Sequence, residues 1–587
     1  MRRAGLVAAL ALALLLPGAI VARAHAPDAD AEVLRADGLP DATAWWSAAG
    51  RAGYAPSTEW LGVAYPWNLA GLVRGTWTFD DTRRMPGVRS GPGVAAAHAP
   101  LAWFDSLRVA RAGGAGAWEG FEAAMVPVSG DVFGTERASG GGMRSMSMFS
   151  FQRGSSALEE NAISFAGGDS LSELHFEGVS GSRGAVGVYE DAGEHRYGGS
   201  LRMDRGIHRF EGRFAHRGSA MEIAGGAAGQ SAMGAGASLI WSMRGAHDVT
   251  RLELRRATDW HESYGWLIDP SRRDQSEEEA EATWAHDRGN DRLGLRASWW
   301  KSHVRRITLD TPEADTKSDG WWLAARGERP LGAIVADAAV GLGAQGGSGG
   351  LVVAPSLGFA TRRGPYSAMA RFERIATPVW SDLAPGVAPF LQDTWTGALT
   401  LAAGDSARHA RVTGRLGRTV GRAVAVRLPL EELWLRNGYE LDPDPYHFAL
   451  ASFEGAWGGH GLGAMLEAFA LARARSDAQA AVDPVNGVRV TLEGGRRLFR
   501  NELGVRLRVN AAVVGARESE ATGAWQSAYV TYGAGGILTI MDVTMVIEAI
   551  NLEDQPHPLT WIDPRTASDA LGPGLETRVT FSWRLFN

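Results

Sequence analysis

The 587-residue chain contains no cysteine, so disulfides, thiolate catalysis and thiolate metal ligands are all excluded. Lysine is nearly absent too, because Lys301 and Lys317 are the only two and every other basic residue besides histidine is arginine. The formal net charge of -7 and the lack of a basic run give no reason to expect nucleic acid as a partner. No stretch after residue 25 offers the roughly 20 consecutive apolar residues of a transmembrane helix, which excludes a helical membrane protein.

The first 24 residues have the features of an export signal. Two arginines follow Met1, residues 6–16 form an apolar run of Ala, Leu and Val, and Ala22 and Ala24 are the small residues that a signal peptidase recognises. The apolar run is shorter than a membrane span, which argues against a helical anchor. We therefore expect a signal peptide at 1–24 and export of the mature chain.

From residue 143 to the end, segments of about ten residues alternate apolar with polar or small side chains, and turn residues separate them. Residues 503–509 show the pattern: Leu503, Val505 and Leu507 share one face of a strand, whereas Arg506 and Arg508 share the other. We count about 22 such segments, within a range of roughly 18 to 24, and find no fixed repeat of the kind that marks a soluble solenoid or propeller. The prediction is an all-β fold: a large antiparallel transmembrane β-barrel over 143–587.

Connector lengths and tryptophans agree with a barrel. Several turns have two to four residues, as expected of periplasmic turns, and longer outside loops are predicted at 266–276, 311–318, 379–388, 431–445 and 555–574. Tryptophans near the predicted strand ends indicate an aromatic girdle at the headgroup level: Trp241, Trp299, Trp300, Trp321, Trp322, Trp395, Trp457 and Trp525.

Residues 25–142 differ in kind from the rest. They contain few alternating runs, a Trp45-Trp46 pair and many prolines, and they end in three glycines at 140–142. We predict a short, plug-like N-terminal domain that ends in a hinge.

The C-terminal hairpin resembles the last hairpin of TonB-dependent receptors. In that family the penultimate strand runs into an "Asn-Leu-x-Asp" turn, and a "Pro-Gly-Arg" element precedes the closing strand. Asn551, Leu552 and Asp554 occupy the first motif here, and Pro573 and Gly574 the second, with Leu575 in place of Arg. The closing strand then places Val579, Phe581, Trp583 and Leu585 on the predicted lipid face, which is similar to the signal that the barrel-assembly machinery recognises.

A weaker resemblance to the plug of the same family lies in the N-terminal segment. Val109, Arg111 and Gly120 match the plug element, and Glu32-Val33-Leu34 is the nearest candidate for the box that contacts TonB. The resemblance implies a 22-stranded barrel with a reduced plug in the outer membrane. It also implies outer-membrane lipid, the barrel-assembly machinery and a TonB-type energy-coupling protein as partners.

Polar faces of the predicted strands are rich in arginine. Fixed guanidinium groups around a lumen favour anions, so the predicted transport barrel is expected to take up a small solute, with an anionic one favoured. The candidate lumen-lining residues are Arg209, Arg213, Arg251, Arg255, Arg292, Arg296, Arg411, Arg415, Arg506 and Arg508. In the alternative, these arginines pair with carboxylates such as Glu177, Glu211, Glu253 and Glu493 and brace the wall. A passive porin-like channel, or a structural or adhesion barrel, is the alternative function.

Enzymatic motifs are not found in a convincing context, so we expect no enzyme, no cofactor and no metal site. The acidic run at 276–281 is compatible with a divalent ion, but a solvated strand start beside an outside loop is the preferred interpretation.

Overall fold

The computed structural model describes residues 146–586, apart from parts of the connections between strands, and five short strands that precede them. In this described part of the chain, no helix is both long enough and apolar enough to cross a membrane.

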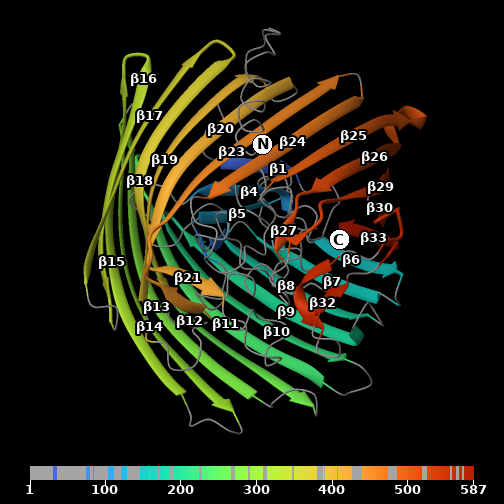
Figure 1. Ribbon diagram of the computed structural model, residues 1–587, viewed down its shortest axis with the longest axis horizontal. Helices are drawn as coiled ribbons and strands as arrows, with labels where there is room; N and C mark the ends of the chain where they lie inside the picture. The colour runs from blue at the N-terminus through green and yellow to red at the C-terminus, as the bar shows by residue number, and fades with distance from the viewer. Residues whose placement is uncertain are drawn as a thin grey trace.

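Twenty-two antiparallel strands close into one barrel, in which each strand pairs with the next one along the chain and β33 pairs with β6 (Figure 1). The wall strands are β6 (Met146–Gly154), β7 (Glu159–Gly168), β8 (Ser172–Arg183), β9 (Tyr189–Arg205), β10 (His208–Ile223), β11 (Ala228–Arg244), β12 (Asp248–Gly265), β13 (Ser271–Arg288), β14 (Asp291–Thr308), β15 (Ala314–Leu331), β16 (Ile334–Gln345), β17 (Leu351–Arg363), β18 (Tyr366–Val379), β19 (Phe390–Gly404), β20 (Arg408–Val420), β23 (Tyr446–Gly459), β24 (Leu462–Arg473), β25 (Asn486–Leu498), β26 (Leu503–Val514), β29 (Tyr529–Ile540), β30 (Val543–Ile550) and β33 (Glu576–Phe586). The predicted fold class and strand number are confirmed.

The two ends of the barrel differ in their connections. At the short-turn end, each connection spans two to four residues, such as 206–207 between β9 and β10 or 332–333 between β15 and β16. At the opposite, loop end, connections reach from 421 to 445 and from 551 to 575. All five predicted outside loops fall at the loop end, which agrees with the expected alternation. The predictions at 266–276 and 311–318 are too long, because β13 begins at Ser271 and β15 at Ala314.

Three long connections contain a small hairpin of their own. These hairpins are β21 (Arg422–Ala425) with β22 (Tyr439–Asp442), β27 (Arg517–Glu518) with β28 (Trp525–Gln526), and β31 (Pro558–Asp563) with β32 (Ser568–Leu571). A 3-10 turn (Phe499–Asn501) joins β25 to β26. At the short-turn end, Asp169 accepts backbone N–H groups of Leu171 and Ser172 at 2.8 and 2.7 Å, and these hydrogen bonds lower the pKa of its carboxyl group.

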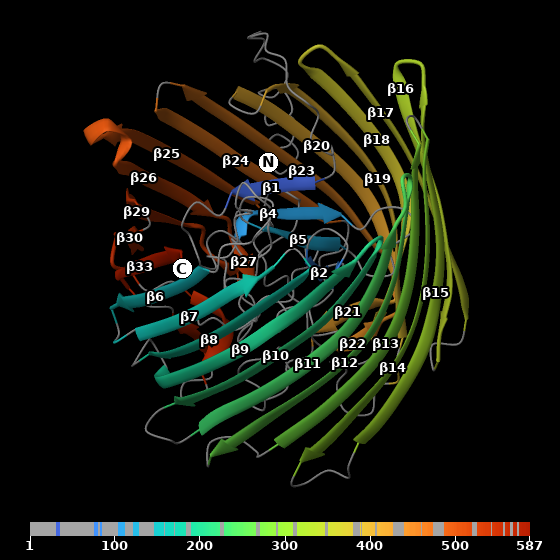
Figure 2. The ribbon, with the colours of Figure 1, turned by 180° about the vertical axis from the view of Figure 1, so that it is seen from behind.

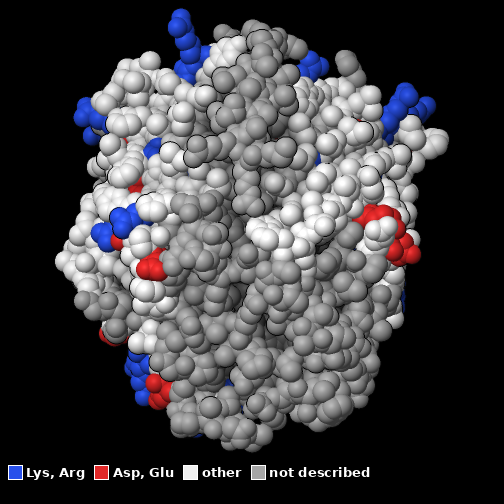
Figure 3. All heavy atoms as spheres, in the orientation of Figure 1, with Lys and Arg blue, Asp and Glu red and all other residues white. Residues whose placement is uncertain are grey.

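The two faces of the wall alternate residue by residue. On β12, Leu252 and Leu254 are 46 % and 60 % exposed, whereas Arg251, Glu253 and Arg255 are 5 %, 6 % and 8 % exposed. A single-layer barrel has only two faces and its outside is covered by nothing within the wall, so the buried face is the inner one. The apolar outer face suits lipid, and the described side chains in the space-filling view are mainly uncharged, with charged groups scattered among them (Figure 3).

Aromatic residues form two levels on the outer face. The lower level lies near the short-turn end and contains Trp241, Trp284, Tyr366, Trp457 and Trp583. The upper level lies on other strands, eight to ten residues from the short-turn end of each, and contains Tyr197, Trp299, Trp321, Trp395 and Tyr532. Just beyond the upper level, Lys301 faces Asp319 across β14 and β15, and Arg374 pairs with Asp393 at 2.8 Å. This change from apolar through aromatic to charged side chains matches the sequence of layers from hydrocarbon to water.

Three tryptophans do not fit the girdle prediction. Trp300 and Trp322 are 0 % and 1 % exposed and lie on the inner face, because they directly follow the outward Trp299 and Trp321 in a strand of period two. Trp525 is exposed but belongs to β28, outside the barrel wall.

A separate five-stranded sheet precedes the barrel in sequence. Its strands are β1 (Ala31–Arg35), β2 (Gly75–Phe79), β3 (Arg83–Arg84), β4 (Phe104–Arg111) and β5 (Phe121–Pro127), in the spatial order β1-β4-β5-β2-β3. The β2–β5 pair is parallel, unlike every pair in the barrel. Figures 1 and 2, which view the molecule from opposite sides, both draw this sheet within the outline of the barrel.

Candidate functional site

A ladder of buried ion pairs covers the inner face of β10 to β14. On β10, Arg213 pairs with Glu211, and on β12, Arg251 pairs with Glu253; all four residues are 5–8 % exposed. Each pair consists of alternate residues of one strand, so both side chains point to the same side of the sheet. The ladder therefore follows directly from the period-two pattern of the sequence.

Arg255 is buried between two carboxylates of the ladder. Its guanidinium group lies 3.2 Å from the carboxylate of Glu277 and also contacts Glu279, and both carboxylates belong to the neighbouring strand β13. The exposed fractions of the three side chains are only 6 %, 1 % and 4 %. Removing three charges from water costs several kcal/mol per ion, and close pairing with hydrogen bonds offsets that cost.

Within the ladder, two glutamates that face each other each have their own arginine. Glu253 and Glu281 stand directly opposite each other on β12 and β13, where two carboxylates would repel. Each has its own counter-ion, because Glu253 contacts Arg251 and Glu281 accepts hydrogen bonds from Arg296 at 2.7 and 2.9 Å. The result is a wall whose fixed charges largely cancel.

Smaller ion-pair groups continue around the inner face. Asp337 on β16 contacts Arg326 of β15 and lies 3.4 Å from Arg371 of β18. On β20 and β23, Glu454 lies 2.5 Å from His409 and 3.8 Å from Arg411. Ion pairs between inward-facing side chains therefore occur on β15 to β23 as well as on β10 to β14.

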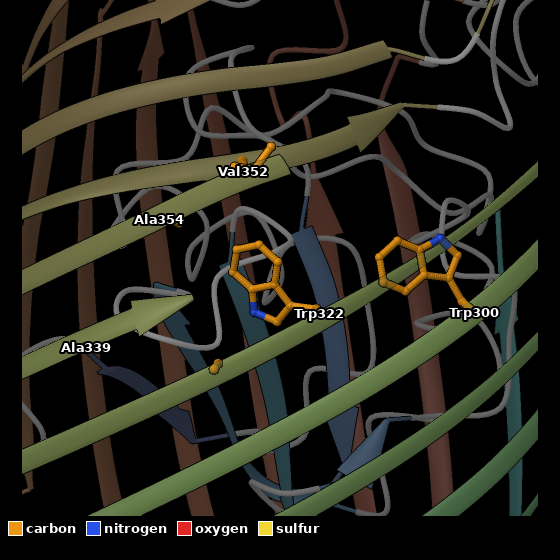
Figure 4. Close-up of a cluster of buried hydrophobic side chains, with 7 residues drawn as sticks. Trp300, Trp322, Ala339, Val352 and Ala354 are labelled. Carbon is orange, nitrogen blue, oxygen red and sulfur yellow. The ribbon is translucent and has the colours of Figure 1, made fainter. Parts of the chain in front are cut away.

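An apolar cluster adjoins the ladder on β14 to β18 (Figure 4). It comprises Trp300, Trp322, Ala324, Ala339, Val352, Ala354 and Ala376. A Cβ atom at Gly320 would come within 2.2 Å of the Trp300 ring, and one at Gly341 within 2.0 Å of the Trp322 ring. Each indole therefore occupies the space beside a glycine of the next strand, where the Cβ of any other residue would collide with the ring.

All ten candidate arginines lie on the inward face, opposite the exposed apolar row. At least eight of them have a carboxylate within 4 Å among the described residues: Arg209, Arg213, Arg251, Arg255, Arg292, Arg296, Arg411 and Arg508. Glu211, Glu253 and Glu493 are partners, as the bracing alternative expects, and the side chain of Glu177 lies outside the described residues. This arrangement favours bracing of the wall over a row of free cations.

The interpretation of the acidic run 276–281 as a solvated strand start is wrong. The run lies inside β13, where Glu277 and Glu279 are buried against Arg255 while Glu278 points outward and is half exposed. Within the described ranges, no group of three or more His, Asp or Glu is placed to hold a metal ion. Sequence analysis missed Glu277, Glu279 and Glu281 as wall residues, although their spacing of two was the available signal.

The C-terminal motif residues make a compact turn between β30 and β33. Leu575 donates its backbone N–H to Asp554 at 2.7 Å, and Asn551 donates its side-chain amide to the Gln555 carbonyl at 2.7 Å. On β33, Trp583 is 52 % exposed, in keeping with its predicted outward face, and Phe581 stacks on Phe151 across the closing seam at 4.9 Å. Pro573 lies outside the described residues.

The upstream motif residues fall in the small sheet. Val109 and Arg111 belong to β4, Glu32-Val33-Leu34 belong to β1, and Gly120 lies outside the described residues. Strand β1 pairs with β4, with Val33 opposite Arg108.

Fold and wall together define a large antiparallel transmembrane β-barrel with a polar, charge-balanced interior. In sequence, no protein family and no curated protein matches the chain.

Solved structures do match. The siderophore receptor PirA from Acinetobacter baumannii superposes with a TM-score of 0.71 at 10 % identity, over 95 % of this chain and 98 % of its own. The copper transporter OprC superposes with a TM-score of 0.74 at 10 % identity, over 96 % of this chain and 99 % of its own. The FrpB iron transporter from Neisseria meningitidis superposes with a TM-score of 0.72 at 8 % identity, over 95 % of this chain and 99 % of its own. The chain therefore has a TonB-dependent receptor-like fold, as the C-terminal hairpin predicted.

Proposed function

We propose that the protein is an outer-membrane transporter that takes up a small solute through a gated barrel lumen. The observation that carries the proposal is the closed 22-stranded barrel, with short turns at one end and long connections at the other. Similarity in fold to receptors and transporters for siderophores, copper and iron supports the same function. None of these neighbours is named as an enzyme, and we propose no catalytic activity.

Residues 25–142 are proposed to gate the lumen. A barrel of this size leaves a lumen that is wide enough to leak unless something fills it, and outer-membrane transporters of that size are plugged. The five-stranded sheet supports this role, because it precedes the barrel directly and is drawn within its outline (Figure 2).

Energy coupling to a TonB-type protein belongs to the same proposal. Strand β1, which contains the candidate box Glu32-Val33-Leu34, lies at the edge of the small sheet. An edge strand has one side free of pairing within its sheet, which suits the addition of a strand from a partner protein.

The wall arginines support an anionic solute only weakly. At least eight of the ten lie within 4 Å of a carboxylate, so the described wall presents little net positive charge to the lumen. We infer that solute recognition rests mainly on the long connections at the loop end, which lie outside the ion-pair ladder.

Cell fractionation tests the location on which the proposal depends. We expect the mature chain, after removal of residues 1–24 and insertion by the barrel-assembly machinery, in the outer-membrane fraction. Closed barrels resist detergent, so unboiled protein should migrate differently from boiled protein on a gel. Recovery of the folded chain from the soluble periplasm would overturn the proposal.

A passive porin-like channel or a structural barrel is the competing function. It predicts that removing the N-terminal domain leaves the conductance unchanged, whereas the gated transporter predicts a large increase.

A further inference from the structure

The connection between β30 and β33 poses a closure problem. It spans residues 551–575, whereas β29 and β30 are joined by residues 541–542 alone. The entropic cost of bringing two strands together grows with the length of the loop between them. The register must nevertheless be correct, because a slip of one residue would turn Phe581 and Trp583 from the outer face to the inner face.

The beginning of this connection is fastened to the barrel wall. Leu552 donates its backbone N–H to the Tyr532 carbonyl at 3.0 Å, and the Glu553 carboxylate accepts the Tyr532 N–H at 3.0 Å. Tyr532 belongs to β29, two strands away from β33 in the wall order. Leu552 therefore adds one backbone hydrogen bond to β29 beyond the end of β30, and Glu553 adds a second through its side chain.

The same residues fold into a tight local turn. Asn551 and Asp554 both have a positive φ, 57° and 53°, a conformation that Asn and Asp tolerate better than most residues. The Asp554 N–H donates to the Asn551 carbonyl at 2.9 Å, and the Asn551 side chain donates to the Gln555 carbonyl. Since these contacts lie within five residues of one another, they need no barrel to form.

The turn also captures the far end of the connection. The Asp554 carboxylate accepts the N–H of Leu575, which directly precedes β33 and its first pair, Glu576 with Ile550. The Asp554 oxygen approaches so closely that a Cβ at Gly574 would come within 2.3 Å of it. Asp554 and Gly574 thus fit together at the point where pairing of the closing strand starts.

We propose that residues Asn551–Asp554 and Gly574–Leu575 form a latch that joins the two ends of this connection before the barrel closes and thereby sets the register of β33. The latch shortens the loop that remains to be ordered to residues 555–573. In this assignment, Asp554 is a positioning residue for assembly and has no contact with solute.

Refolding kinetics of the full-length chain from denaturant into lipid vesicles test the latch. Asp554→Ala should slow formation of the folded, gel-shifted species about fivefold, which is the effect of one net hydrogen bond, and leave the unfolding rate within about twofold. Asp554→Asn, which keeps the acceptor oxygen, should restore most of the rate. The matched control is Asp405→Ala, because Asp405 accepts the Arg408 N–H at 2.8 Å in a short turn that closes without help.

A second pair of variants isolates the contact between Asp554 and Gly574. Gly574→Ala should slow refolding when Asp554 is present and have little further effect when residue 554 is alanine, since the oxygen that the new Cβ would meet is then absent. An unchanged refolding rate in Asp554→Ala, an effect on unfolding alone, or additive effects of the two substitutions would overturn the proposal. If Asp554→Ala yields no folded protein, a wild-type rate in Asp554→Asn with a slow Gly574→Ala supports the latch, and equal rates in those two contradict it.

Discussion

The two halves of the barrel are built differently. In the tall half, defined as β9 to β15, strands have 16 to 18 residues and the loop-end connections are only four or five residues long. In the loop-rich half, defined as β18 to β33, the wall strands have 8 to 15 residues, and each loop-end connection contains ten residues or more. The tall half contains the buried ion-pair ladder, and the loop-rich half contains all three extra hairpins.

This difference separates two tasks within one wall. Long strands with short connections leave few backbone groups outside the sheet, and the buried charges of the ladder in the tall half form ion pairs within that half. Long connections offer an extended surface at the loop end, which in the proposed transporter would meet the solute first. The tall half is therefore the scaffold, and the loop-rich half is the proposed recognition side.

Loss of an inner charge should have the largest effect on stability. Arg255→Ala removes a cation that contacts both Glu277 and Glu279, which are buried, so we expect the free energy of unfolding to fall by about 3–5 kcal/mol. Arg256→Ala is the control, because its side chain is 72 % exposed and lies 3.9 Å from Glu278 on the outer face. That change should cost less than about 1 kcal/mol. Urea-induced loss of the gel-shifted form measures both, and equal costs would contradict the ladder.

A larger side chain in the apolar cluster should lower the free energy of unfolding, but by less than Arg255→Ala does. Gly341→Val places a side chain where the Trp322 ring lies, and overpacking of this kind destabilises by about 1–3 kcal/mol. Gly341 lies on β16, which borders the tall half, and the matched change in the loop-rich half is Gly397→Val, since a Cβ at Gly397 meets nothing within 4 Å. The same denaturation assay applies. If both variants were equally stable, the indole would not depend on the glycine surface.

Ion selectivity should respond least, because most wall charges are paired. Arg508 lies 3.5 Å from Glu493, and its side chain is 30 % exposed, more than the ladder arginines of β10 and β12. Replacing Arg506 and Arg508 together with Glu should move the reversal potential in planar bilayers toward cations. Arg256→Glu on the outer face is the control. An unchanged potential in the double variant would remove the remaining support for an anionic solute.

Much of this architecture was predictable because the period-two pattern repeats in every strand. The strand number, the inward arginines and the loop end all follow from it, as the alternation around Arg506 and Arg508 illustrates. Cross-strand partners were not predictable, since the register of β12 against β13 decides that Arg255 meets Glu279. The same information was missing for the acidic run, whose counter-ions lie on other strands.

Strand length explains the remaining errors. The outside loops predicted at 266–276 and 311–318 extend too far along the chain, because β13 and β15 have 18 residues and begin earlier than strands of about ten residues would. The girdle prediction included Trp300 and Trp322 because it rested on tryptophans near strand ends and did not consider which face of the strand each side chain occupies. Two adjacent residues of one strand cannot both face lipid, so each Trp-Trp pair required one inward indole.

The conductance of a truncated chain tests the central claim of a gated lumen most directly. A variant with the signal peptide joined to residue 140 keeps every barrel strand and lacks the N-terminal domain. In planar bilayers we predict a far larger conductance than that of the full chain, with cells becoming sensitive to large antibiotics. Equal conductance of the two proteins, with the barrel still assembled, would contradict the gate and favour a channel that its own wall and loops already narrow.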